Sequence, residues 1–61
     1  MSYWDRLEQV ADYLEGKTDI YNGKHNEVIN TWNNAWDEMA YQGFAPDKAS
    51  GVRKYIEANK C

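Results

Sequence analysis

At 61 residues the chain has room for one small domain and not for a second, so we expect residues 1–61 to fold as a single unit. The only cysteine is Cys61, which excludes an internal disulfide, and with His25 it falls short of the four ligands of a structural zinc site. The net charge of -3 opposes a general attraction to nucleic acid or to an anionic membrane.

Without a disulfide or a metal site, aromatic side chains are the main means by which this chain can build a core. Ordering each residue costs about 1.5 kcal/mol, so a short chain must bury much apolar area per residue. Aromatic residues make up 15% of this chain, and each one can remove about 150–250 Å² from water. We therefore expect Trp4, Trp32 and Trp36 to anchor the core.

The N-terminal segment shows no basic stretch followed by an apolar run, and no stretch approaches the roughly 18–20 apolar residues of a membrane span. The default expectation is a cytoplasmic protein without a membrane partner. Because a helix is expected to begin almost at Met1, we interpret the chain as a complete small gene product. Whether Cys61 is native or an added handle stays open.

The first predicted helix covers residues 3–15. Ser2 and Asp5 have the spacing at which side chains satisfy free amides at a helix start. Gly16 is a suitable C-terminal stop. Apolar residues recur on one face at helical spacing: Tyr3, Leu7, Val10, Ala11 and Leu14. The connection that follows, over residues 16–24, contains the turn signal Asn22-Gly23, and we expect Ile20 or Tyr21 to pack onto the core.

The second predicted helix covers residues 25–42 and is the central one, with Asn26 as a candidate N-cap and Gly43 as its C-terminal stop. Its apolar stripe contains Val28, Ile29, Trp32, Ala35, Trp36, Met39 and Ala40. The opposite face holds carboxylates, carboxamides and one aromatic ring, and no lysine or arginine: Asn26, Glu27, Asn30, Asn33, Asn34, Asp37, Glu38 and Tyr41.

The third predicted helix covers residues 47–59. Pro46 and Asp47 suit a helix start. Gly51 is a weak point, because glycine lowers helix stability, and the alternative is therefore a helix that starts at Ser50. Its inner face is expected to contain Ala49, Val52, Tyr55 and Ile56. The three segments together predict an all-α fold, a small three-helix bundle.

Catalytic chemistry finds no support in these residues. One histidine and one terminal cysteine make no Cys-His pair or Ser-His-Asp arrangement, and no glycine-rich loop could hold a phosphate. Carboxylates do recur along the first helix, but acid–base work would need a cleft for which so small a bundle has little volume. We expect no enzymatic activity, no cofactor and no bound metal.

Two surfaces are candidates for binding a partner. The first is the polar face of the second helix, formed by Asn30, Asn33, Asn34, Asp37, Glu38 and Tyr41, with tyrosine as its aromatic anchor. The second is the acidic row of the first helix, formed by Asp5, Glu8, Asp12 and Glu15, which could steer a basic partner. Each surface has a plainer interpretation as the solvated side of an amphipathic helix.

The leading functional hypothesis is a non-enzymatic protein-binding module that regulates or inhibits a partner protein, of the kind that viruses and plasmids encode. The alternative is a self-associating homodimer whose spare aromatics complete a shared core. Nucleic-acid binding ranks third. The third helix does offer Lys48, Arg53, Lys54 and Lys60, but the chain is acidic overall.

Overall fold

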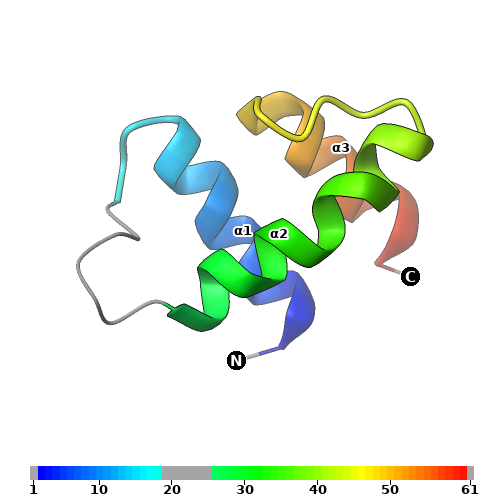
Figure 1. The fold of residues 1–61 in the computed structure, drawn as a ribbon. Coiled ribbons are helices and arrows are strands. Elements are labelled where there is room, and N and C mark those ends of the chain that lie inside the picture. The colour runs from blue at the N-terminus through cyan, green and yellow to red at the C-terminus, as the bar shows by residue number, and fades with distance from the viewer. Residues whose placement is uncertain (1, 19–25, 61) are drawn as a thin grey trace.

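A computed structural model describes residues 2–18 and 26–60, which form three α-helices: α1 (Tyr3–Leu14), α2 (Asn26–Tyr41) and α3 (Ala49–Asn59). The described residues contain no strand, and the predicted all-α three-helix fold is confirmed. Helix α1 packs extensively against both other helices, whereas α2 and α3 touch each other little. Figure 1 shows α2 crossing in front of α1, with α3 beyond the C-terminal half of α2. Ile20, Tyr21, His25 and Cys61 lie outside the described residues.

Helix α1 begins at the predicted residue and ends at Leu14, one residue before the predicted end, with the predicted residues at both caps. The Ser2 hydroxyl accepts a hydrogen bond from the Asp5 backbone N–H at 3.1 Å, which satisfies one free amide of the first turn. At the other end Gly16 has a φ of +81°, and the Lys17 N–H donates to the Asp12 carbonyl at 2.9 Å. This six-to-one hydrogen bond is that of a Schellman cap, which favours glycine at the left-handed position.

Helix α2 ends in the same way, and its cap turns the chain back toward the core. Gly43 has a φ of +89°, and the Phe44 N–H donates to the Met39 carbonyl at 2.9 Å. Phe44 then packs on the core next to Tyr55. At the other end, Asn26 is itself helical, which differs from the N-cap position predicted for it outside the helix.

Helix α3 begins two residues later than the main prediction and one residue from its alternative. The Pro46 carbonyl accepts a hydrogen bond from the Trp32 indole Nε1–H at 2.9 Å. Pro46 and Asp47 therefore form a turn before the helix, and Lys48 is the N-cap residue. The first bond of regular helical spacing runs from the Val52 N–H to the Lys48 carbonyl, at 3.0 Å.

Gly51, predicted to be a weak point, is a packing contact. A Cβ atom at this position would fall on the carbonyl oxygen of Ala45 and 2.7 Å from its nitrogen. The residue is buried inside α3. Glycine is therefore required at position 51, because the chain segment before α3 folds directly onto the first full turn of α3.

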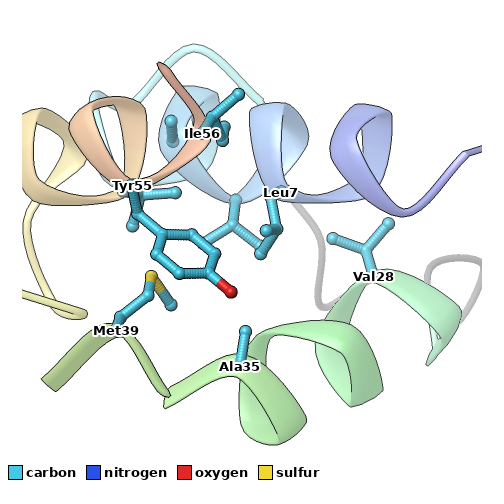
Figure 2. Close-up of a cluster of buried hydrophobic side chains, with 9 residues drawn as sticks. Leu7, Val28, Ala35, Met39, Tyr55 and Ile56 are labelled. Carbon is cyan, nitrogen blue, oxygen red and sulfur yellow. The ribbon is translucent and has the colours of Figure 1, made fainter. Parts of the chain in front are cut away.

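The core lies where the three helices meet, and Figure 2 shows the ring of Tyr55 extending from α3 between Leu7 of α1 and Ala35 and Met39 of α2. Its other members are Val10, Ala11, Val28, Val52 and Ile56. Tyr3 and Trp4 cover Tyr55 on one side: the two tyrosine hydroxyls share a hydrogen bond of 3.3 Å, and the ring centroids of Trp4 and Tyr55 are 6.0 Å apart. The predicted inner faces of α1 and α3 therefore supply most of the core.

The tryptophans lie around this core rather than at its centre, which corrects the prediction for Trp36. Trp4 and Trp32 are half-buried against the core, but Trp36 keeps 40% of its surface exposed. Thr31, which the apolar stripe omitted, is only 7% exposed. Its hydroxyl donates to the Glu27 carbonyl at 2.7 Å and accepts from Arg6 Nε at 2.8 Å. Because that hydroxyl is satisfied, α2 can turn its Thr31 side to the core and its Trp36 side outward.

Candidate functional site

The side of α2 that faces away from the other helices carries the residues predicted to bind a partner. At about 100° of rotation per residue, Asp37 lies opposite the buried line of Thr31, Ala35 and Met39. Six exposed residues form what we call the outward face of α2: Asn30, Asn33, Asn34, Asp37, Glu38 and Tyr41. The structure therefore brings this predicted set together on one continuous surface.

Two large aromatic side chains are exposed on or beside this face. Tyr41 is 89% exposed in the last turn of α2, so its ring does not fold back over the helix end. Trp36 lies at the edge of the face, next to the exposed Ala40. Behind Trp36 the rings continue inward, since its centroid is 5.8 Å from that of Trp32, which in turn is 6.1 Å from that of Tyr13 of α1. Packed rings behind Trp36 hold it in a defined position.

The charge on α2 has one sign. Its 16 residues include the exposed carboxylates of Glu27, Asp37 and Glu38 and no lysine or arginine. The Glu38 carboxylate accepts a hydrogen bond from Gln42 Nε2 at 2.7 Å. The ion pairs between described residues lie elsewhere and join acidic residues of α1 and its C-cap to Arg53 of α3, to Lys60 and to Lys17, which follows α1.

The acidic row of α1 lies against α3, apart from the outward face of α2. Arg53 donates to Asp12 Oδ1 at 2.8 Å and to Glu15 Oε1 at 2.9 Å, and Lys60 Nζ is 3.8 Å from Glu8 Oε1. Hydrogen bonds from Arg53 and Lys17 lower the pKa of the Glu15 carboxyl. Asp5 is exposed in the first turn of α1. Most of this row is thus engaged within the protein.

A shallow depression of about 130 Å³ lies between α1 and α3, lined by Glu8, Arg53, Ile56 and Glu57. Ligand pockets typically enclose about 300–1,000 Å³. Among residues 2–18 and 26–60, no group of three His, Cys, Asp or Glu residues could hold a metal ion. Within the same residues, no helix combines the length and apolar character needed to cross a bilayer.

Trp36 is the surface residue that the sequence reasoning missed. Its position on the apolar stripe predicted that it would be buried. Helical periodicity identifies a broad apolar stripe but does not show which edge of that stripe remains uncovered. The residue that could have indicated the exposure of Trp36 is Thr31, which is β-branched and carries a methyl group. Thr31 lies one turn before Ala35, on the edge of the stripe opposite Trp36. No family model, no curated protein and no solved structure matches this chain, so its function is inferred from its own residues.

Proposed function

We propose that this chain is a non-enzymatic protein-binding module that regulates or inhibits a partner protein through the outward face of α2. The observation that carries the proposal is the exposure of Tyr41 and Trp36 on a helix surface that no other described part of the chain covers. Tyrosine and tryptophan are over-represented among the residues that dominate binding energy at protein interfaces. Trp36 and Tyr41 are therefore the expected anchors, and Asp37 lies between them.

The composition of the face supports the same proposal. Asn30, Asn33 and Asn34 are poorer helix formers than alanine, glutamate or lysine, so they weaken the helix that carries them. Each exposed carboxamide can both donate and accept hydrogen bonds, which suits a contact surface with polar specificity. A face selected only for helix stability and solubility would carry paired glutamate and lysine instead.

The α1 acidic row takes second place in this proposal. Asp12 and Glu8 already face Arg53 and Lys60, so a basic partner would have to compete with internal ion pairs. The same pairs reduce the support for nucleic-acid binding, because two of the four cations on which that alternative depends face carboxylates. We propose that the chain acts in the cytoplasm and without a cofactor.

The experiment is affinity capture from the cells that produce the protein, with four baits compared side by side. The baits are the native chain, Tyr41→Ala, Trp36→Ala and the control Glu57→Ala, which changes an exposed residue of α3. We expect a protein that the native chain and the Glu57→Ala variant retain equally and that both aromatic variants lose, with circular dichroism unchanged. Equal retention by all four folded baits would remove the outward face of α2 from consideration.

Self-association is the second candidate function, and the exposed edge at Trp36 and Ala40 is the observation that favours it. A core of this size can be completed by another copy of the chain. Sedimentation at several concentrations separates the two functions. A helical monomer down to low micromolar concentration eliminates obligate dimerisation, whereas dissociation coupled to loss of helicity would establish it.

A further inference from the structure

The sign and position of the charges on α2 restrict the chemistry of whatever covers it. We infer that the partner presents a basic protein surface, in which lysine or arginine side chains surround an apolar patch; this inference rests on the proposed function. The apolar patch would cover Trp36 and Ala40, and the cations would meet Asp37 and Glu38. Glu27 extends the same negative charge to the other end of the helix.

The C-terminal half of α2 is an unfavourable place for carboxylates. Aligned peptide dipoles give a helix C-terminus a partial negative charge, so cations are favoured there and anions are disfavoured. Helix α2 has Glu38 in its last turn, with Asp37 immediately before it, and has no basic residue in that turn. A cation supplied by a partner would relieve the repulsion of these carboxylates by the helix end.

The internal ion pairs separate this face from the other acidic surface. In the described part of the chain, Arg53 and Lys60 face the carboxylates of α1, and the structure gives no ion pair between a cation and a carboxylate of α2. Electrostatic complementarity at an interface mainly sets specificity and the rate of association. A basic partner is therefore directed to α2 rather than to α1.

The other occupants of this face fit less well. A second copy placed symmetrically would set the carboxylates of one α2 against those of the other, because a two-fold contact uses the same patch on both chains. Nucleic acid would bring phosphates to a face that has no cation. The exposed aromatic rings need an apolar counterpart, which a basic surface with an apolar centre supplies.

The test uses two synthetic amphipathic peptides with the same leucine face, one with lysine and one with glutamate on the polar face. Each is titrated into the ¹⁵N-labelled protein and followed by amide chemical shifts. We expect the lysine peptide to shift the amides of the outward face of α2 and the glutamate peptide to leave them unchanged. Affinity should fall as salt rises from about 50 to about 300 mM, over which screening shortens the reach of exposed charges.

Matched variants separate the charge inference from the proposed contact face. The double variant Asp37→Asn/Glu38→Gln should weaken lysine-peptide binding by about three- to ten-fold, as expected for two exposed ion pairs. Glu57→Gln is the control and should leave binding unchanged. Equal binding by the double variant, or shifts confined to α1 and α3, would overturn the inference. If both peptides bind the face equally and Trp36→Ala abolishes binding, the contact face stands and the basic partner is wrong.

Discussion

Gly51 is a position where the bundle has no room for an added methyl group. The start of α3 and the turn before it are in backbone contact there, because Gly51 lies against the backbone of Ala45. A glycine inside a helix normally lowers its stability relative to alanine by about 1 kcal/mol. Here the close approach to Ala45 reverses that order.

We predict that Gly51→Ala lowers the free energy of unfolding by about 1–2 kcal/mol, because overpacking against a backbone exceeds the gain in helix propensity. Urea denaturation followed by circular dichroism measures the change. The neighbouring variant Ser50→Ala is the control, since Ser50 is exposed, and it should be neutral or slightly stabilising. A Gly51→Ala protein as stable as the native chain would show that the turn can move away.

Tyr55 makes stability sensitive to alkaline pH. Burial, followed by the hydrogen bond that its hydroxyl shares with the Tyr3 hydroxyl, raises the pKa of its phenol above the ordinary value of 10.0. The unfolded chain therefore releases this proton near pH 10 while the folded chain keeps it. The contribution of Tyr55 is complete below about pH 10 and is lost progressively above it.

We accordingly expect the free energy of unfolding to fall as the pH rises above about 10, and to fall less steeply in Tyr55→Phe. Denaturation curves at a series of alkaline pH values measure both slopes. Tyr41→Phe serves as the control, because Tyr41 is 89% exposed, and it should keep the native slope. Identical slopes for the native chain and Tyr55→Phe would mean that another group causes the loss.

Individual residues also mark where sequence reasoning reached its limit. The inner residues Leu7, Val10, Ala11, Val52 and Ile56 follow from helical spacing alone. The burial of Thr31 does not, because it depends on a hydroxyl bonded to its own helix and to Arg6 across the α1–α2 contact. The exposure of Trp36 is the consequence of the same rotation of α2.

At the scale of the elements, the ends of the helices were predictable where glycine or serine fixes them. Ser2, Gly16 and Gly43 act through local hydrogen bonds within a few residues, so their positions in the chain are sufficient. The turn before α3 is in contact with the Trp32 indole, which donates to the Pro46 carbonyl from 14 residues away along the chain. A contact of that range is set by the packing of helices and leaves no local pattern.

The Trp32 ring lies between the rings of Tyr13 and Trp36, and its indole N–H donates to the turn before α3. We predict that Trp32→Phe lowers the free energy of unfolding by about 1–2 kcal/mol, because the Pro46 carbonyl loses its donor and some apolar contact is lost. Thermal denaturation measures the loss. Tyr41→Ala, at an exposed site, should stay within about 0.5 kcal/mol of the native chain. A neutral Trp32→Phe would show that the turn is held by other contacts.

At the scale of the whole molecule, the candidate surface follows from which helices pack against each other. Helix α1 lies between the other two as their common partner, so α2 is covered on one side only. The sequence predicted the members of the outward face, since polar residues on one side of an amphipathic helix are readily identified. It could not show that this face stays uncovered, that Trp36 joins it, or that Arg53 and Lys60 pair with most of the acidic row of α1. These depend on how the helices are placed relative to one another.

The most direct test of the central claim is photocrosslinking in the producing cells. A photoreactive benzoylphenylalanine replaces Asn33 on the outward face of α2 in one protein and Lys54, an exposed residue of α3, in another. We predict that position 33 gives an adduct with one other protein and that position 54 does not. An adduct formed only from position 54, or an adduct from position 33 that contains only a second copy of the chain, would contradict the assignment of α2 as the surface for a different partner.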